Sequence, residues 1–219
     1  MLPLDLTMAM RYLGVTKPDP VLAQTVADTA AQLTRRIVPR FTYREFSVVH
    51  EENVVVLPEA GLTLSGHMAC AMLADCDRAA LMVCTLGAMF DAWLRTEQTR
   101  DMARAVVLDA CGSAYVESGC DAAEQEIAAR HPQLYLTDRF SPGYGDLMLD
   151  LQPAILAATD AARRLGVTVS ASNLMNPSKT VTAIIGLADR PQRARIRGCA
   201  YCAMRETCPY HKRGEHCHV

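Results

Sequence analysis

The chain has 219 residues, of which half are hydrophobic and 21% are charged, a composition typical of one soluble domain or of one domain with an appendage. The formal net charge of −2 at pH 7 excludes the strongly basic surface that binding to nucleic acid or anionic lipid requires. The apolar run at residues 79–90 is far shorter than the roughly 20 residues of a membrane-spanning helix, and residues 1–10 have no basic n-region of an export signal. We therefore expect a cytoplasmic protein that has neither nucleic acid nor membrane as a partner.

The first predicted element is a helix near the N-terminus. Asp19 is a good N-cap residue, and Pro20 suits the first helical position, where its missing N–H costs nothing. Apolar residues then recur at helical spacing over residues 21–37. Pro39 ends the pattern.

Strands follow the first helix. Residues 41–48 alternate loosely between apolar and polar, and residues 53–57 form a short β-branched run. Ser65 is expected to cap a helix that runs through residue 76, after which residues 79–85 predict a buried strand.

The middle of the chain is predicted to be helical. Leu86-Gly87 forms a turn into a long helical stretch that reaches about Ser118. Asp121 is expected to start a new helix, which ends near His131-Pro132.

The remaining pattern mixes strands and helices without a βαβ repeat. Residues 133–137 predict a short strand, and residues 152–165 predict a helix that ends at Gly166. Residues 167–170 and 180–186 predict two more strands.

This order predicts an α+β fold with a mixed or antiparallel twisted sheet and flanking helices. We expect one domain over residues 1–197 and a short Cys-rich, metal-binding tail over residues 198–219.

The segment after the short strand stands out because its backbone cannot be regular. Pro142, Gly143 and Gly145 lie within four positions, and the glycines permit positive φ and a close approach to a ligand. Arg139 offers a fork of donors that suits a carboxylate, and Tyr144 adds a ring able to stack on a flat ligand. Chemistry alone leaves a second interpretation open, an ordinary turn whose arginine caps a helix or pairs with a neighbouring aspartate.

The sequence resembles the activation domain of cobalamin-dependent methionine synthase at this segment. Arg139-x-x-x-Gly143-Tyr144 is similar to the Arg-x-x-x-Gly-Tyr signature of that family. The similarity continues in order through the segments Gly166-Val-Thr168 and Ser172-x-x-Met175-x-Pro177-Ser-Lys-Thr-Val181, and upstream at Thr85-Leu-Gly87. It covers roughly residues 12–187 and is specific over about residues 139–186.

The resemblance implies a site for S-adenosylmethionine. Arg139 would bind the carboxylate of this cofactor, and backbone groups around Ser141 and Gly143 would help to hold it. Tyr144 would lie between S-adenosylmethionine and the corrinoid. Glu117, on the preceding long helix, is the candidate for contacting the amino group, with an ordinary exposed carboxylate as the alternative.

Two departures from the family pattern matter. Gly145-Asp146 stands where the family usually has proline after Gly-Tyr, and the sequence has no Asp-x-His-x-x-Gly segment to ligate cobalt. The resemblance therefore implies a subunit, in methionine biosynthesis or a related pathway, that reactivates cobalamin on a separate corrinoid-binding methyltransferase. Flavodoxin or ferredoxin would donate the electron, and no side chain is needed as a catalytic nucleophile. The alternatives are a non-catalytic corrinoid-protein partner and an iron–sulfur electron-transfer protein.

The nine cysteines fall into two groups. Five are scattered among alanines and aliphatic residues and are expected in the core: Cys70, Cys76, Cys84, Cys111 and Cys120. The other four are close together near the C-terminus: Cys199, Cys202, Cys208 and Cys217. In a reducing compartment such a cluster indicates a metal more than disulfides, so an iron–sulfur cluster or zinc is expected there, with an unmetallated terminus as the alternative.

Overall fold

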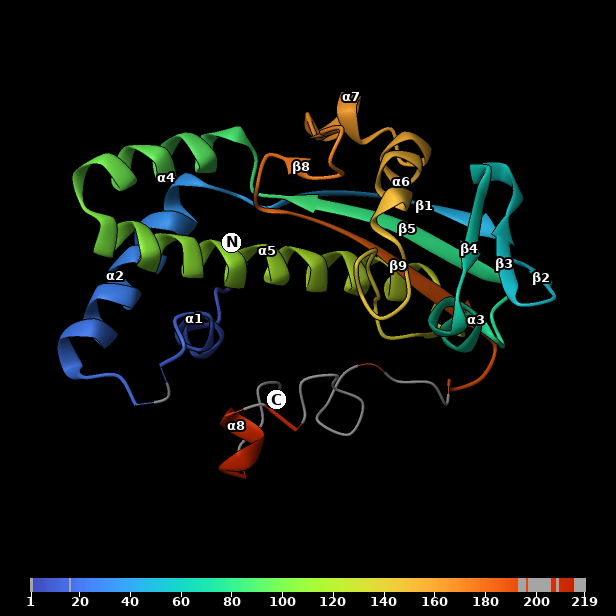
Figure 1. The fold of residues 1–219 in the computed structure, drawn as a ribbon, viewed down its shortest axis with the longest axis horizontal. Helices are drawn as coiled ribbons and strands as arrows, with labels where there is room; N and C mark the ends of the chain where they lie inside the picture. The colour runs from blue at the N-terminus through green and yellow to red at the C-terminus, as the bar shows by residue number, and fades with distance from the viewer. Residues whose placement is uncertain (1, 16, 193–195, 197–205, 208, 215–219) are drawn as a thin grey trace. The chain divides into compact units, whose positions relative to one another are not determined.

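The computed structural model describes residues 2–15, 17–192, 196, 206–207 and 209–214. Its helices and 3₁₀ turns are α1 (Leu6–Tyr12), α2 (Pro20–Arg36), η1 (Pro58–Ala60), α3 (His67–Leu73), α4 (Ala88–Arg100), α5 (Met102–Arg130), η2 (Leu149–Leu151), α6 (Gln152–Ala158), α7 (Ala161–Leu165) and α8 (Pro209–Lys212) (Figure 1). Its strands are β1 (Arg40–Ser47), β2 (Val49–Glu51), β3 (Val54–Leu57), β4 (Leu62–Ser65), β5 (Arg78–Thr85), β6 (Tyr135–Leu136), β7 (Thr168–Val169), β8 (Met175–Asn176) and β9 (Thr180–Ala188).

The strands form three sheets, with the orders β1-β5-β9-β6, β2-β3-β4 and β7-β8. The β2–β3, β3–β4, β6–β9 and β7–β8 pairs are antiparallel. The predicted α+β class, with antiparallel strands and flanking helices, is confirmed. The boundary predicted at residue 198 falls outside the described residues and stays a prediction.

The chain divides into two compact units, each built from three stretches of sequence. Unit 1 comprises Met1–Thr42, Val83–Gln125 and Asp160–Val181. Unit 2 comprises Tyr43–Met82, Glu126–Thr159 and Thr182–Val219.

The predicted N-terminal helix of unit 1 is confirmed as α2. The Asp19 Oδ1 atom accepts a hydrogen bond from the Leu22 amide at 2.8 Å, as expected of an N-cap residue. Val26 and Leu33 are fully buried along one face of the helix. The shorter α1 that precedes it was not predicted, although Asp5 caps it in the same way.

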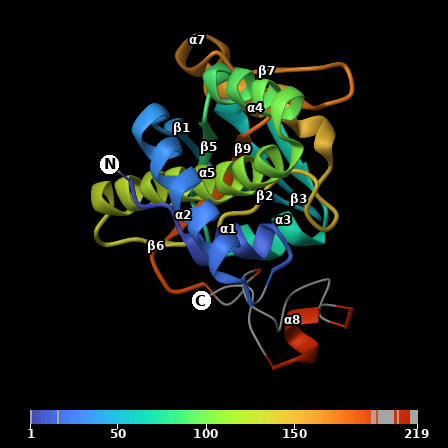
Figure 2. The same ribbon diagram turned by 90° about the vertical axis from the view of Figure 1, so that its left-hand side faces the viewer.

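Helices α4 and α5 lie beside one another in unit 1 (Figures 1 and 2). They meet at Asp101, whose extended backbone ends α4 and whose carboxylate accepts from the Arg104 amide at 3.1 Å. The new helix predicted at Asp121 is wrong, because α5 continues without a break to Arg130. Asp121 is an exposed position on this helix, not a cap.

Two glycines let α5 approach its neighbours in unit 1. An added Cβ on Gly112 would lie 2.3 Å from the Phe90 ring of α4, and one on Gly119 would lie 2.6 Å from Cys84 Sγ of β5. Real Cβ atoms do not approach so closely, so glycine is required for this packing.

The helix predicted over residues 152–165 is interrupted. It consists of α6 and α7, because Asp160 adopts a left-handed backbone with φ of +55° between them. Gly166 ends α7 with φ of +71°, as predicted.

In unit 2, α3 packs against β3 and β4. The helix predicted after Ser65 is present as α3, which ends at Leu73. The predicted cap is wrong, because Ser65 is the last residue of β4 and pairs with Val54. Gly66 follows with φ of +112° and makes no side-chain cap of its own.

The cysteines predicted for the core are mostly confirmed. Cys76, Cys84, Cys111 and Cys120 are fully buried, whereas Cys70 on α3 is only half-buried. Burial raises the pKa of the Cys76 and Cys111 thiols to about 12, which keeps both protonated at neutral pH. Within the part of the chain that the structure describes, none of the helices has the length and apolar character needed to cross a bilayer.

Candidate functional site

The Arg139 segment lies on the loop that joins β6 to η2 in unit 2. Phe140, which is 1% exposed, holds the start of this loop against β9. Its amide donates to the Ile184 carbonyl at 3.1 Å, and the Ile184 amide donates to the Phe140 carbonyl at 2.8 Å. The side chains on either side of Phe140 therefore start from a fixed backbone position.

The rest of the loop is irregular, as its glycines predict. The Tyr144 amide donates to the Ser141 carbonyl at 3.1 Å, and the Leu147 amide donates to the Tyr144 carbonyl at 3.0 Å. The Gly143 amide donates to the Leu147 carbonyl at 2.7 Å, which closes the loop on itself. Gly143 and Gly145 have φ of +91° and +56°, conformations that favour glycine.

Four of the predicted cofactor-binding residues are near neighbours in sequence and lie on this one loop. Arg139 and Ser141 are half-buried, and Gly143 is exposed. The Tyr144 side chain is 57% exposed, so its ring is available to a flat ligand. A guanidinium, exposed backbone and an aromatic ring within six positions are suited to an amino acid carboxylate joined to a planar group.

Asp146 has a role that the sequence did not indicate. Its Oδ2 atom accepts from the His67 amide at 2.5 Å, and its Oδ1 atom accepts from the Met68 amide at 3.1 Å. These bonds, chiefly the one from Met68, hold the pKa of the Asp146 carboxyl below its usual range. Asp146 therefore gives α3 the cap that Gly66, which has no side chain, cannot supply. The sequence signal was an aspartate in a glycine-rich loop, because Ser65 was expected to cap the helix.

Glu117 is not placed on this loop. It lies half-buried in the middle of α5 and belongs to unit 1, whereas the loop belongs to unit 2. Its contact with an amino group stays a prediction.

The segment that follows β8 is held within unit 1 by a buried carboxylate and by an ion pair, neither of which the sequence indicated. The buried Asp91 carboxylate accepts from the Ser178 amide at 2.8 Å and from the Ser178 hydroxyl at 2.7 Å. Lys179 Nζ donates to Asp109 Oδ2 at 2.9 Å and to Ser113 Oγ at 2.8 Å. Residues 178 and 179 are thus fixed to α4 and α5.

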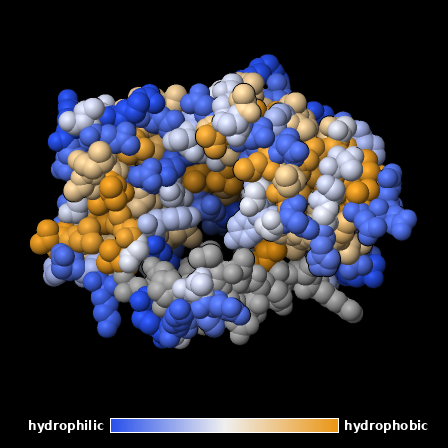
Figure 3. Space-filling view, viewed as in Figure 1, coloured by the Kyte–Doolittle hydropathy of each residue, from blue (hydrophilic) through white to orange (hydrophobic). Residues whose placement is uncertain are grey.

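A separate pocket of about 250 Å³ lies among α1, α4 and α5 of unit 1. Tyr12, Met102 and Val106 line it and are all more than half exposed, and Figure 3 shows apolar residues gathered at the end of unit 1 that carries α1 and α2. Asp109 also lines it, but this carboxylate is already paired with Lys179. The pocket is a mainly apolar recess without a free acid–base pair among the side chains described.

The four tail cysteines predicted as metal ligands lie outside the described residues. Among the residues that the structure does describe, no three His, Cys, Asp or Glu side chains come together in a way that would hold a metal ion.

Comparisons with known proteins support the fold. No family model and no curated protein matches the chain. A crystal structure of the MetH reactivation domain bound to AdoHcy superimposes with a TM-score of 0.66 over 84% of this chain and 73% of that chain, at 15% sequence identity. The chain therefore shares the fold of that reactivation domain.

Proposed function

We propose that this chain binds S-adenosylmethionine at the loop 139–147 and supports the reductive reactivation of cobalamin on a separate corrinoid-dependent methyltransferase, such as methionine synthase. One observation carries the proposal. The Arg-x-x-x-Gly-Tyr residues occupy an exposed, irregular loop within a fold shared with a domain whose crystal structure contains AdoHcy. AdoHcy is what remains of S-adenosylmethionine after its methyl group has left.

Each loop residue has a distinct task in this proposal. The Arg139 guanidinium binds the carboxylate of the methionine moiety through charge-assisted hydrogen bonds. The backbone from Ser141 to Gly143 lines the ligand, because Gly143 has no side chain to block its approach. Tyr144 presents its exposed ring to the corrinoid that the partner carries.

The chemistry places few demands on the protein. One electron, from a flavodoxin or ferredoxin, reduces cob(II)alamin to cob(I)alamin, whose cobalt then takes the methyl group from the sulfonium sulfur. Methylcobalamin and S-adenosylhomocysteine are the products, and no proton has to move. Because holding two reactants together offsets several kcal/mol of the barrier, positioning alone is a sufficient contribution.

The cysteine tail is assigned a supporting role in this proposal. An iron–sulfur cluster there would relay the electron, whereas zinc would only stabilise the tail. The visible absorption of protein purified without oxygen distinguishes them, because thiolate-to-iron bands are coloured and zinc is colourless.

Calorimetry with S-adenosylmethionine tests the binding step. We expect the wild-type chain to bind, and Arg139→Ala to raise the dissociation constant about 10- to 100-fold, because a hydrogen-bonded charged pair contributes roughly 1.5–3 kcal/mol. Arg139→Lys should recover only part of this loss, since an ammonium group lacks the two-pronged geometry.

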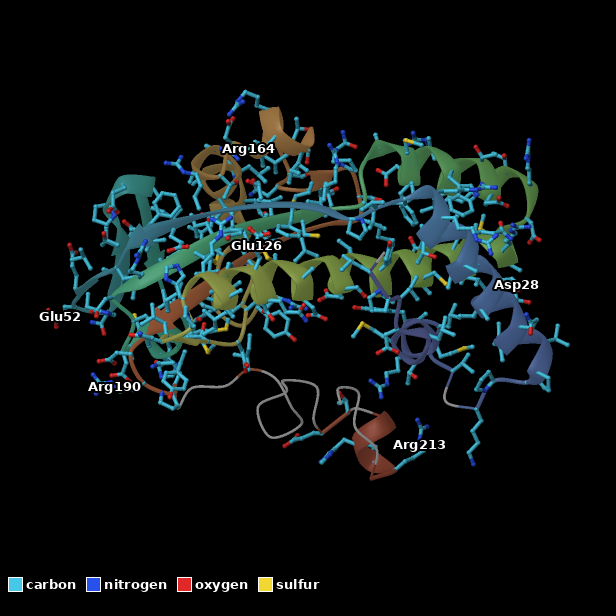
Figure 4. The ribbon with its side chains drawn as sticks, turned by 180° about the vertical axis from the view of Figure 1, so that it is seen from behind. Asp28, Glu52, Glu126, Arg164, Arg190 and Arg213 are labelled. Atoms are coloured by element: carbon cyan, nitrogen blue, oxygen red, sulfur yellow. The ribbon has the colours of Figure 1, made fainter. Side chains whose placement is uncertain are left out.

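Arg164→Ala is the matched control. It removes an exposed guanidinium from α7 (Figure 4) and should leave the affinity unchanged. Absence of binding by the wild type, or equal binding by Arg139→Ala, contradicts the proposal. A mixture of the chain, a corrinoid protein, a reductant and methyl-labelled S-adenosylmethionine then tests transfer of the label to cobalt.

A further inference from the structure

We propose that Asp146 is a positioning residue for the ligand-binding loop, which fixes the loop to the first turn of α3 and thereby sets its affinity for S-adenosylmethionine. The inference rests on the proposed function for its ligand. The contacts that support it are hydrogen bonds between Asp146 and α3 within unit 2, and they do not involve the ligand.

The contacts of Asp146 replace a missing helix cap. The first amides of a helix have no partner within the helix, and α3 starts after Gly66, which has no side chain to supply one. The Asp146 carboxylate accepts from the amides of His67 and Met68 at 2.5 and 3.1 Å. A carboxylate suits this place, since its negative charge faces the positive end of the helix.

Glycines on both chain segments leave room for the contact between the loop and α3. A Cβ on Gly66 would lie 2.8 Å from Asp146 Cγ, and a Cβ on Gly145 would lie 2.7 Å from Met68 Cε. Both residues also have positive φ, +112° at Gly66 and +56° at Gly145, a backbone conformation that favours glycine.

The binding residues lie between two points at which the loop is attached to the rest of unit 2. Phe140 holds the start of the loop on β9, and Asp146 holds its end on α3. Tyr144 and Gly143 lie between these two fixed points. Without the cap the loop would sample other conformations. The apparent dissociation constant would then rise in inverse proportion to the fraction of molecules whose loop keeps the binding conformation.

The test compares three variants of the full chain by calorimetry with S-adenosylmethionine. Asp146→Ala should weaken binding about tenfold, which corresponds to about 1.4 kcal/mol. Asp146→Asn should weaken it about threefold, because its amide oxygen still accepts one bond. Asp19→Ala removes a similar cap from α2 of unit 1 and should lower the melting temperature without changing the affinity.

Wild-type affinity in Asp146→Ala, or an equal loss in Asp19→Ala, overturns the inference. Hydrogen exchange measured without ligand tests the role of Asp146 separately from the proposed binding of S-adenosylmethionine. The amides of Gly143 and Leu147, which donate within the loop at 2.7 and 3.0 Å, should exchange about tenfold faster in Asp146→Ala and not in Asp19→Ala. If the wild type does not bind S-adenosylmethionine, the proposed function fails. Faster exchange then still supports the role of Asp146 in fixing the loop, and unchanged exchange overturns it.

Discussion

Replacing Asp91 by alanine removes the carboxylate that holds the segment after β8 to α4. Asp91 is 8% exposed and lies in the first turn of α4, where it accepts two hydrogen bonds from Ser178, at 2.8 Å from the amide and 2.7 Å from the hydroxyl. A hydrogen bond to a charged group contributes roughly 1.5–3 kcal/mol when it is buried. Ser178 itself is exposed, so water replaces part of what is lost.

We therefore expect Asp91→Ala to lower the free energy of unfolding by about 2–3 kcal/mol. Ser178→Ala should lower it by about 1 kcal/mol, because the backbone amide of residue 178 still donates its hydrogen bond to Asp91. The double variant should lose less than the sum of the two, because both changes remove the same hydroxyl bond. Urea denaturation of the four proteins gives the coupling energy directly.

Asp28→Ala provides the matched control, because Asp28 is an exposed aspartate on α2 (Figure 4) whose carboxylate accepts a hydrogen bond from the Gln24 side chain of the same helix. It should change the free energy of unfolding by less than about 0.5 kcal/mol. If Asp91→Ala also changes the free energy of unfolding by less than about 0.5 kcal/mol, or if the effects of Asp91→Ala and Ser178→Ala are strictly additive, the contribution assigned to the Asp91–Ser178 contact is refuted.

Two further predictions concern the interior of the protein. Gly119→Ala should lower the free energy of unfolding by about 1–3 kcal/mol in urea denaturation, because its Cβ would lie 2.6 Å from both Cys84 Sγ and Pro39 Cβ; a neutral effect would mean that α5 packs less closely. Cys76 and Cys111 should stay unmodified by iodoacetamide in the native protein at pH 8, as mass spectrometry can show, because burial raises the pKa of both thiols to about 12. Since these thiols ionise near pH 9 when unfolded, the stability that they contribute is present below that pH and falls as the pH rises toward 12.

Local signals explain which elements could be predicted. The start of α2 was predicted because Asp19 and Pro20 act on their own helix. Ser65 and Asp121 were misassigned because the same residue types also occur in strands and on helix surfaces, and neighbouring residues do not decide between these uses. In both cases the tertiary structure decides: Ser65 pairs with Val54 on β3, and α5 continues through Asp121.

In the candidate site, too, features set by neighbouring residues could be predicted and features set by distant residues could not. The irregular loop around Arg139 could be predicted because its glycines and proline are adjacent in sequence. The roles of Asp146 and Asp91 could not, because the chain positions of their partners are 79 and 87 residues away. No short spacing pattern reports such contacts, and only the folded chain brings them together.

The state of the Asp146 carboxyl connects the loop to its chemistry. Its pKa is held below the ordinary value of 3.8, chiefly by the Met68 amide, so the group is ionised at neutral pH and is committed to capping α3. It is therefore unsuited to proton transfer, and the methyl transfer that we propose requires none. Because the folded pKa is lowered, the stability that the cap contributes is present above pH 3.8 and is lost as the pH falls through the lower, folded value.

The difference in melting temperature between the wild type and Asp146→Ala should accordingly be constant from pH 6 to 8 and shrink in acid below the ordinary carboxyl range. Asp19→Ala, whose cap lies in unit 1, serves as the reference for acid effects that have nothing to do with the loop. A difference that grows in acid would mean that Asp146 is protonated when it holds the loop. The carboxyl would then be free to act as an acid, and a reaction based on positioning alone would no longer describe this site.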